Sequence, residues 1–241
     1  MGEMNNFWNA RLILKTYAGS HSYGTNIKGS DEDFRGVCIP PENCLLGLDK
    51  FEQKESVEPD EVIYSLQKFV RLALQNNPNI LDVLFVADNH IVYINEFGKE
   101  LRDLRYDFLS KNVYKTYGGY AYAQLKKMVT VGKDASGKRL ADIQKYGFDT
   151  KNAYHLIRLL RMGIETLTDG EVYVLRHDNQ ELLKIRRGEH PLTYIESEAI
   201  RLRNLLDQAY VNSKLPAKPN YDKINAWLID THKRSLKWKG N

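Results

Sequence analysis

The stretch from Gly19 to Asp33 contains residue types that phosphate chemistry requires, at a spacing that can bring them together. Asp31 and Asp33 are separated by one residue, and alternate side chains of a β-strand share a face, whereas Glu32 points away. A strand places two such Cα atoms about 6.5–7 Å apart. Carboxylates at that spacing can share two divalent ions about 3.5–4 Å apart. Mg²⁺ favours such oxygen ligands and leaves further positions for substrate phosphates.

A Gly-Ser pair, Gly19-Ser20, follows an apolar segment that is typical of a strand. The turn after such a strand can offer backbone N–H groups and a hydroxyl to phosphate oxygens. Glycine also permits close approach of the backbone to a ligand. The ordered set of strand, Gly-Ser turn and Asp-x-Asp strand therefore predicts a site for phosphoryl or nucleotidyl transfer.

A third carboxylate is predicted at Asp60, which begins a strand expected to pair beside Asp33. On that strand Asp60 shares a face with alternate residues, and Glu61 falls on the opposite face. An alternative is that Asp60 only follows Pro59 in a turn. Other nearby carboxylates also remain candidates for the role, namely Glu52, Glu55, Glu58 and Glu61.

The apolar periodicity predicts a small mixed α/β module over residues 1–95, followed by a helical, basic module over residues 96–241. In the first module, strands are expected at 11–17, 33–39, 51–55 and 60–64. Helices are expected at 66–74 and 80–86, and Asn79 is expected to cap the second of them. Helices of the second module are expected at 96–106, 113–131, 138–146, 150–168, 193–212 and 221–235, with a linker at 132–137 and an extended piece at 171–175. The active site is expected in a cleft between the modules.

The composition is that of an ordinary globular protein, with 42% hydrophobic and 27% charged residues. Residues 1–100 carry a formal charge of −6 and residues 101–241 one of +10. One interpretation is an acidic half that holds cations beside a basic half that meets phosphates. The other is two solvated surfaces of opposite sign that help each other dock.

Several classes of protein are excluded at this level. No apolar run approaches the ~18 residues of a membrane helix, and the first residues do not form a signal peptide, so we expect a soluble, cytoplasmic protein without a membrane partner. Cys38 and Cys44 lack metal-site spacing and are predicted to be reduced thiols. The P-loop, G-x-G-x-x-G and H-E-x-x-H patterns are absent. The oligomeric state is not predicted.

Taken together, the motifs resemble the DNA polymerase β-like nucleotidyltransferase superfamily, whose signature is Gly-Ser followed by Asp-x-Asp. Within it, the chain is similar to a family of prokaryotes and phages associated with RNA-repair operons. The resemblance covers nearly the whole chain. Besides the signature it is carried by Gly24-Thr25, Ser30-Asp31-x-Asp33-x-Arg35-Gly36, Tyr64-Ser65-Leu66-x-Lys68-Phe69, Asn77-Pro78-Asn79, Tyr146-Gly147-x-Asp149-x-Lys151, Tyr154-His155-Leu156-Ile157-Arg158-Leu159-Leu160-Arg161 and Ile185-Arg186-Arg187-Gly188.

The resemblance implies an α+β fold, in which a polymerase-β-like nucleotidyltransferase domain with a small mixed sheet precedes a helical domain. It implies that Asp31 and Asp33 bind two Mg²⁺ or Mn²⁺ ions, with Asp60 as the third carboxylate. Gly19 and Ser20 would then contact the β- and γ-phosphates of a nucleotide. Further nucleotide contacts are expected from Ser30, Arg35, Lys151, His155 and Arg158.

Three of these residues, Lys151, His155 and Arg158, share one face of a long predicted helix, and Arg161 and Glu165 extend that face. The simplest interpretation is a solvated face of an amphipathic helix. Beside an acidic metal-binding module, the same face could instead hold a triphosphate or an acceptor phosphate. Glu165 would then pair with Arg161 or Arg158.

Two other groups are open to a binding role but have a simpler interpretation. The pair Arg186-Arg187 is predicted to lie in a surface turn. Four tyrosines near lysines could stack on bases, or could be helix core with surface hydroxyls. They are Tyr114, Tyr117, Tyr120 and Tyr122.

The predicted activity is metal-dependent transfer of a nucleoside monophosphate from an NTP to an acceptor hydroxyl, with release of pyrophosphate, a reaction of the EC 2.7.7 type. The family association and the basic second half favour an RNA acceptor, with a protein side chain or a small molecule as alternatives. The competing function is an inactive nucleotidyltransferase fold that binds nucleotide or RNA. The intact carboxylate pair argues against it, because an abandoned site has no reason to keep groups that repel each other.

Overall fold

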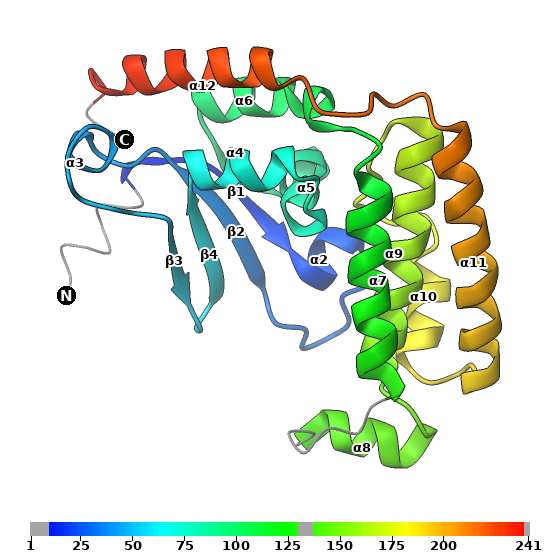
Figure 1. Cartoon of the computed structure of the whole chain (residues 1–241). Coiled ribbons are helices and arrows are strands. Elements are labelled where there is room, and N and C mark those ends of the chain that lie inside the picture. The colour runs from blue at the N-terminus through cyan, green and yellow to red at the C-terminus, as the bar shows by residue number, and fades with distance from the viewer. Residues whose placement is uncertain (1–9, 130–136, 239–241) are drawn as a thin grey trace. The chain divides into compact units, whose positions relative to one another are not determined.

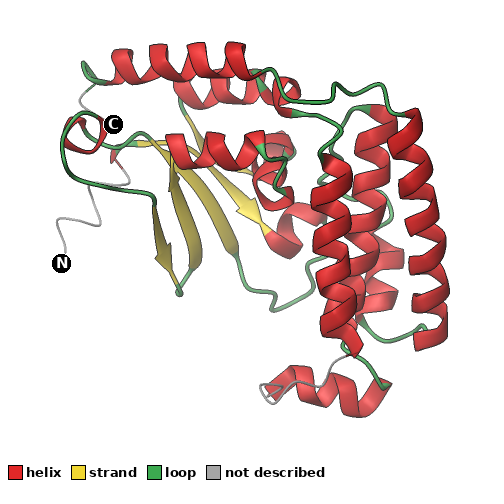
Figure 2. Ribbon diagram, viewed as in Figure 1, coloured by secondary structure: helices red, strands yellow, loops and turns green. Residues whose placement is uncertain are grey.

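The computed structural model describes residues 10–129 and 137–238, and it combines strands with helices (Figure 1). The chain divides into two compact units. The first contains the segment up to Leu109 together with the segment from Lys218 onward, and the second runs from Ser110 to Ala217. The strands of the described chain all belong to the first unit (Figure 2).

The first unit is built on a five-stranded sheet with the strand order β3-β4-β2-β1-β5. Strands β2 and β4 are parallel, and the other neighbouring pairs are antiparallel. The bounds of the strands are β1 Leu12–Ala18, β2 Asp33–Cys38, β3 Gln53–Ser56, β4 Asp60–Ser65 and β5 Ile91–Ile94.

Strand alternation gives the sheet two chemically different faces. The Asp33 face, as we call it, carries Asp33 and Arg35 of β2, and the Lys15 face carries Lys15 of β1 and Phe34 of β2. The parallel register pairs Asp33 with Asp60, so both belong to the Asp33 face. The carboxylates and the cation of Lys15 are therefore separated by the sheet itself.

The helices of the first unit begin at capping residues that satisfy free N–H groups of the first turn. Ser65 caps α4, and Asn95 caps α6. Asn77, and not the predicted Asn79, caps α5, because Pro78 fits the first helical position and moves the start two residues upstream. The elements are α2 Gly19–Tyr23, α3 Glu42–Leu45, α4 Leu66–Leu74, α5 Pro78–Phe85, the 3₁₀ turns η1 Asp88–His90 and η2 Arg105–Phe108, α6 Glu96–Asp103 and α12 Tyr221–Ser235.

Helix α12, the last of the chain, runs beside α6 and is held in the first unit by polar contacts (Figure 1). The Glu100 carboxylate of α6 accepts hydrogen bonds from Trp227 Nε1 and Arg234 Nη1, both at 2.9 Å. Lys223 forms an ion pair with Asp107 of η2 at 2.8 Å. The start and the end of the chain thus contribute to one unit.

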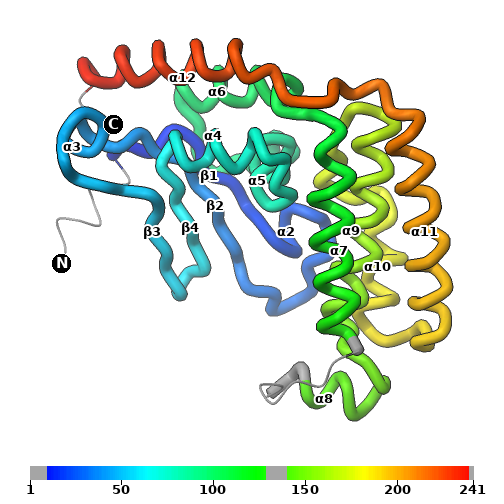
Figure 3. Tube along the Cα trace, in the orientation of Figure 1, coloured from blue at the N-terminus to red at the C-terminus, as the bar shows by residue number. Residues whose placement is uncertain are grey.

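The second unit consists of helices packed around α9, with α7 and α11 beside it (Figure 3). Helix α9 is amphipathic, and its apolar side is fully buried at residues such as Leu156 and Leu160. The helices are α7 Val113–Val129, α8 Gly137–Tyr146, α9 Thr150–Asp169, α10 Asn179–Arg186 and α11 Leu192–Asn212.

Backbone hydrogen bonds join the chain segments on either side of the boundary between the units. In the second unit the Lys111 N–H donates to the Pro216 carbonyl at 2.8 Å, and in the first the Asn220 N–H donates to the Asp107 carbonyl at 2.9 Å. The predicted division into residues 1–95 and 96–241 differs from this arrangement. Helical periodicity does not reveal which unit a helix packs against, so α6 and α12 were placed with the other helices.

The predicted α+β fold, a mixed sheet unit with helices and a helical part later in the chain, is confirmed. Short elements such as α3, β5 and α10 were not predicted, because four to eight residues show too little periodicity. The predicted extended piece at 171–175 forms no strand. Most of the predicted linker at 132–137 lies outside the described residues. None of the described helices is long and apolar enough to cross a membrane.

Helix α6 approaches the sheet closely at Gly98, since a Cβ there would overlap the Ile13 carbonyl oxygen of β1. We expect Gly98→Ala to lower the free energy of unfolding by about 1–3 kcal/mol through overpacking. The matched control is Gly119→Ala in α7, an exposed helical position with nothing within 4 Å of the new Cβ, which should be neutral or stabilising. Denaturant unfolding of both variants measures the difference, and equal stability would contradict the close approach.

Candidate active site

The Gly-Ser turn lies at the end of β1, where the chain leaves the sheet and forms the short helix α2. Gly19 has φ +57°, a left-handed conformation that favours glycine. The Ser20 carbonyl accepts a hydrogen bond from the Thr25 N–H at 2.9 Å, and the Ser22 hydroxyl donates to the Gly19 carbonyl at 2.9 Å. The turn is therefore held in place by its own backbone.

Asp33 lies directly against this turn. The antiparallel register pairs Ala18 with Asp33, so the carboxylate comes next to Gly19. A Cβ on Gly19 would overlap Asp33 Oδ2. Position 19 therefore favours glycine for two reasons. Its backbone is left-handed, and the Asp33 carboxylate occupies the space that a Cβ would need. The predicted proximity of the Gly-Ser turn and the second aspartate is present in the structure.

Asp60 is the carboxylate that the sheet places beside Asp33. The two residues are register partners in the parallel pair β2–β4. Asp60 Oδ1 accepts a hydrogen bond from Arg35 Nη1 at 3.1 Å, and Arg35 also donates to the Phe34 carbonyl at 2.7 Å. Residues 33 and 35 alternate along β2, so the carboxylates and this guanidinium share the Asp33 face. The structure thus brings together Gly19, Asp33, Arg35 and Asp60.

Two of the four other carboxylates that the sequence left open, Glu61 and Glu52, are placed elsewhere. Glu61 lies on the Lys15 face, where its Oε1 is 2.5 Å from Lys15 Nζ. Lys15 Nζ also lies 4.5 Å from the ring centroid of Phe34 on the intervening strand β2. Glu52 forms an ion pair with Arg71 at 2.8 Å. These positions favour Asp60 as the third member of the set.

Asp31 and Ser30 lie in the loop before β2. The strand begins at Asp33, because β1 ends at Ala18 and β4 begins at Asp60, so no neighbouring strand pairs with Asp31. Strand alternation therefore does not place Asp31 and Asp33 on one face. Asp31 is exposed, and the Ser30 hydroxyl accepts a hydrogen bond from the Ile27 N–H at 2.9 Å.

The chemistry of these residues can be compared with what Mg²⁺ requires. Carboxylate oxygens are its preferred protein ligands, and one or two per ion suffice when phosphates complete the shell. Asp33, Asp60 and exposed Asp31 supply such oxygens. The Asp33 carboxylate lies at the Gly-Ser turn, because Gly19 has no side chain in the space that its Oδ2 occupies. Over the residues that the structure describes, no cluster of three or more acidic, histidine or cysteine side chains is arranged around one point. The donor types fit magnesium, whereas a closed protein cage for it is not formed.

Tyr17, Phe34, His21 and His90 form an aromatic group at the Lys15 face that the sequence analysis did not predict. The Tyr17 ring centroid lies 5.1 Å from Phe34, 5.7 Å from His21 and 6.4 Å from His90. Burial, followed by the nearby charge of His21, lowers the pKa of His90. Strand alternation over residues 11–17 could have indicated this group, because it places Lys15 and Tyr17 on one face of the strand.

In the second unit, the predicted polar face of α9 is not a solvated face. Lys151 is exposed and His155 is half-buried, whereas Arg158 is only 4% exposed. Arg161 is 2.8 Å from Asp178 and 3.2 Å from Glu198. Glu165 pairs with Arg176, not with the predicted Arg161 or Arg158. The network of Arg161, Arg176 and their carboxylates is therefore structural.

The other predicted groups of this unit agree with their simpler interpretation only in part. Arg186 ends α10, where its Nη1 contacts Thr150 Oγ1 at 2.7 Å, so it is not part of an open surface turn. Tyr117 is core, whereas Tyr122 is exposed and has Lys126 Nζ 4.7 Å from its ring centroid. The Tyr114 hydroxyl donates to Asp207 at 2.9 Å.

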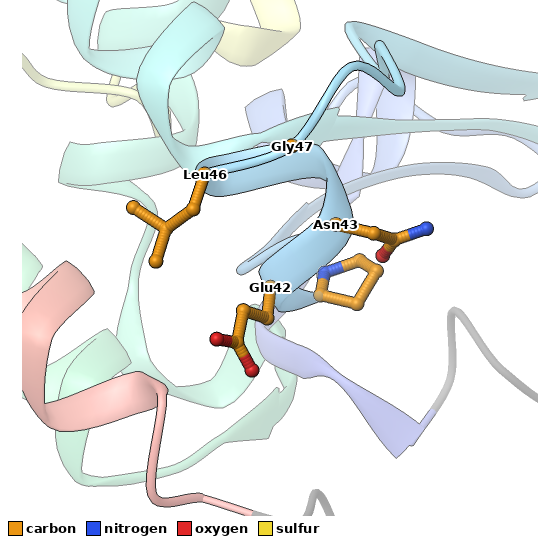
Figure 4. Close-up of a pocket in the computed structure, with 5 residues that line it drawn as sticks. Glu42, Asn43, Leu46 and Gly47 are labelled. Atoms are coloured by element: carbon orange, nitrogen blue, oxygen red, sulfur yellow. The ribbon is translucent and has the colours of Figure 1, made fainter.

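A surface hollow of about 560 Å³ lies at α3 (Figure 4). It is lined by Pro41, Glu42, Asn43, Leu46 and Gly47. None of these residues belongs to the predicted site, and the hollow is open to solvent. The candidate site is therefore defined by the Gly19 turn and the Asp33 face, and not by a deep pocket.

Comparison with known proteins relates the chain to a family, to a phage protein and to a protein of known structure. The family model described as RNA repair pathway DNA polymerase beta family matches residues 1–230. An uncharacterized 38.9 kDa protein in the nrdC-mobD intergenic region of Enterobacteria phage T4 is 30% identical over 147 residues, or 56% of this chain and 42% of that protein, so the chain spans less than half of that relative. A nucleotidyltransferase-like protein of Exiguobacterium sibiricum 255-15, of known crystal structure, is 12% identical over 97% of this chain and 78% of its own, with a TM-score of 0.32.

The contact between Gly19 and Asp33 gives a first prediction for the site. Gly19→Ala should displace the Asp33 carboxylate and abolish any activity that depends on it, with a loss of about a hundredfold or more. Gly29→Ala is the matched control, since Gly29 also has positive φ but a Cβ there meets nothing within 4 Å. Turnover of NTPs and thermal unfolding of both variants are the measurements. If both variants lose activity equally, backbone strain and not the carboxylate contact is responsible.

The environment of His155 gives a second prediction. Burial first, and then the charges of Arg158, Lys151 and Arg186, lower its pKa to about 3 in the folded protein, below the ordinary value of about 6.5. The unfolded chain therefore binds this proton between those pH values and the folded chain does not. Stability is full above about pH 6.5 and falls toward pH 3, by at most about 1.4 kcal/mol per pH unit.

Urea unfolding followed by circular dichroism at pH 7 and pH 5 checks this dependence. His155→Gln should remove part of the loss of stability at pH 5, whereas His177→Gln, at an exposed position, should not. An identical pH dependence in the wild type and both variants would show that His155 titrates normally.

Proposed function

Because the chain belongs to the RNA repair pathway DNA polymerase beta family, we propose that it is a metal-dependent nucleotidyltransferase. The proposed reaction transfers a nucleoside monophosphate from an NTP to an acceptor hydroxyl. The acceptor oxygen forms a bond to the α-phosphorus, the bond to the bridging oxygen of pyrophosphate breaks, and the acceptor proton passes to a base. The family supports the nucleotidyltransferase fold, and the chemistry is inferred from the residues of the site.

One observation supports the proposal above all others, the position of Asp33 between the Gly19 turn and Asp60. A phosphate group at the turn would therefore lie next to carboxylates that can hold its counter-ions. This is the arrangement that transfer of a phosphoryl group to a hydroxyl requires, because charge develops on oxygens close to the transferred phosphorus. A carboxylate pair without a phosphate-binding turn would not suggest it.

The chain's own residues have separate roles in this proposal. Gly19 and Ser20 bind phosphate oxygens through their N–H groups and the serine hydroxyl. Asp31, Asp33 and Asp60 would hold two Mg²⁺ or Mn²⁺ ions, which when bound stabilise negative charge and make the acceptor hydroxyl more acidic. Asp60 accepts the acceptor proton on a carboxylate oxygen.

Arg35 couples the nucleotide to Asp60. Its guanidinium donates to Asp60 Oδ1 at 3.1 Å and has a side-chain exposure of 23%. A guanidinium has five N–H donors, so Arg35 can keep one contact with Asp60 and turn others to a phosphate. We infer that Arg35 orients Asp60 before the substrate binds and contacts the nucleotide afterwards. Ser30 is held by its own loop and contributes to nucleotide binding through the position of that loop.

RNA is the acceptor that we propose. Its support is the description of the family and the formal charge of +10 on residues 101–241. A protein side chain and a small molecule are acceptors of the same chemical type, a hydroxyl. Incubation with each labelled NTP and with each class of acceptor, followed by separation of the products, identifies both substrates.

Two carboxylates that differ by one position give the sharpest test of the site. Asp60→Asn should lower NTP turnover by at least about a hundredfold, because it removes a ligand and the base. Glu61→Gln, the adjacent residue on the opposite face, should leave turnover within about twofold of wild type, since its pair with Lys15 serves only the sheet. Asp31→Ala should abolish turnover and leave a folded protein.

Full Mg²⁺-dependent turnover in Asp31→Ala would overturn the assignment of that ligand. Loss of activity in Glu61→Gln with retention in Asp60→Asn would move the site to the other face of the sheet. An affinity for RNA that falls steeply with salt, without consumption of any NTP, would favour a binding protein over an enzyme.

A further inference from the structure

Helix α7 differs in charge from the other helices of the second unit. Its residues Val113–Val129 include three lysines and no aspartate or glutamate, whereas each of α8, α9, α10 and α11 contains at least one acidic residue. No carboxylate of the helix itself can therefore neutralise these lysines through pairs along the helix. A basic surface of this kind attracts a polyanion.

Four exposed residues of α7 form one row along the helix, which we call the α7 row: Lys115, Gly119, Tyr122 and Lys126. They are spaced by four, three and four residues, so they lie on the same side of the helix. The row is about 16 Å long, because each residue of a helix adds about 1.5 Å. Among the described residues, no carboxylate forms an ion pair with Lys115 or Lys126. A positive charge thus stands at each end of the row.

Tyr122 is the tyrosine of α7 whose ring is most open to solvent. It is 56% exposed, and Lys126 Nζ lies 4.7 Å from its ring centroid, the arrangement of a cation–π pair. Tyr117, by contrast, is buried in the core, and the Tyr114 hydroxyl donates to Asp207 of α11. Tyr122 therefore presents an aromatic surface beside a cation, and such a surface can stack on an unpaired base.

Gly119 has no role in the packing of the described residues. A glycine in the interior of a helix is less favourable than an alanine. The neighbouring Gly118 has a packing reason, because a Cβ there would lie 3.4 Å from Arg203 Nη1 and 3.5 Å from Leu206 Cδ2 of α11. A Cβ on Gly119 would meet nothing within 4 Å. The absent side chain of Gly119 therefore leaves room for the close approach of a group from outside the unit.

We propose that the α7 row binds single-stranded RNA. Lys115 and Lys126 contact phosphates at the two ends of the row. Tyr122 stacks on an unpaired base, and the RNA backbone passes over Gly119. The strand must be single, because the bases of a duplex are stacked on one another and have no free face. The charge of α7 and the exposed ring support a polyanion that carries bases, and the choice of RNA rests on the proposed function.

The salt dependence of RNA affinity tests the phosphate contacts. Fluorescence anisotropy measures the binding of a labelled, unstructured RNA oligonucleotide to the full chain without divalent ions, over a series of salt concentrations. Lys115→Gln and Lys126→Gln should each reduce the slope of log affinity against log salt by about 0.7, the loss of one phosphate contact to a single strand. Lys184→Gln is the matched control, since Lys184 is exposed on α10, outside the α7 row. Equal slopes in the wild type and both row variants would overturn the proposal.

Substitutions of Tyr122 test base stacking in the same assay. Tyr122→Leu should weaken RNA binding about tenfold, whereas Tyr122→Phe keeps the ring and should bind like the wild type. Tyr173→Leu is the matched control, because Tyr173 is a tyrosine of the same unit that is 41% exposed and lies outside the α7 row. Full affinity in Tyr122→Leu, or equal weakening by Tyr122→Leu and Tyr173→Leu, would contradict stacking on this ring.

Gly119→Leu separates RNA binding from folding. Leucine favours the helix and its Cβ meets nothing within 4 Å, so urea unfolding should show a stability equal to or above that of the wild type. The same variant should weaken RNA binding about tenfold, because its side chain occupies the path of the strand. Gln208→Leu, at an exposed position of α11, should leave the affinity unchanged. Lower stability of Gly119→Leu would show that this position packs inside the molecule, and unchanged affinity would show that no strand passes over it; either result would overturn the proposal.

Two competitors distinguish single-stranded RNA from other polyanions. A duplex RNA of the same sequence and poly-glutamate both carry negative charge, but neither offers unpaired bases. Each should displace the labelled single strand at least about tenfold less well than the unlabelled single strand does. Equal displacement by the duplex would contradict stacking on Tyr122. Equal displacement by poly-glutamate would assign the α7 row to an acidic protein segment, and this result would also overturn the proposal.

The Asp33→Asn variant separates this proposal from the proposed function. It should abolish NTP turnover and leave the affinity for RNA unchanged, because Asp33 belongs to the sheet unit and α7 to the other. Wild-type enzyme that labels RNA, together with row variants that bind RNA normally, would overturn the α7 surface alone. Loss of RNA binding in the row variants, without NTP turnover in any protein, would uphold the surface and reject the transferase.

Discussion

The candidate site depends on one steric constraint, the space beside Gly19 that the Asp33 carboxylate fills. Glycine meets this constraint because its left-handed backbone ends the strand and its missing side chain leaves room for an oxygen. The strand register that pairs Ala18 with Asp33 then fixes where the carboxylate lies, and the register of the next pair adds Asp60. The hydrogen-bond ladder thus places two acidic side chains beside the turn for which we propose phosphate binding.

The sheet also keeps opposite charges apart. Asp33 and Asp60 lie on one face with Arg35, whereas Glu61 and Lys15 neutralise each other on the other face. Because consecutive residues of a strand alternate, a shift of the register by one residue would exchange Asp60 for Glu61. The specificity of strand pairing is therefore as important for the proposed chemistry as the identity of the side chains. In the helical unit, Arg161 and Arg176 are each neutralised by two carboxylates.

Periodicity and turn residues were enough to predict four of the strands, the long helices and the pairing of Asp60 beside Asp33. These features depend on local sequence or on adjacent strands. The alternation argument treated Asp31 as part of a strand, whereas both the predicted strand 33–39 and the observed β2 begin at Asp33, opposite the end of β1. The sequence did not identify the place of Arg186 beside Thr150 or the partner of Glu165, which depend on how separate helices meet. The roles of all these residues in catalysis and binding remain predictions.

The order in which the chain is synthesised has a consequence for the sheet unit. Its final helix, α12, is attached through Glu100 and Asp107, yet it follows the whole segment Ser110–Ala217 in the sequence. A ribosome therefore completes the helical insertion before the sheet receives its last piece. Because the insertion has both ends together at Lys111 and Pro216, it can fold as a closed loop in the meantime. A nascent chain would present the carboxylate face before the unit that bears it is finished.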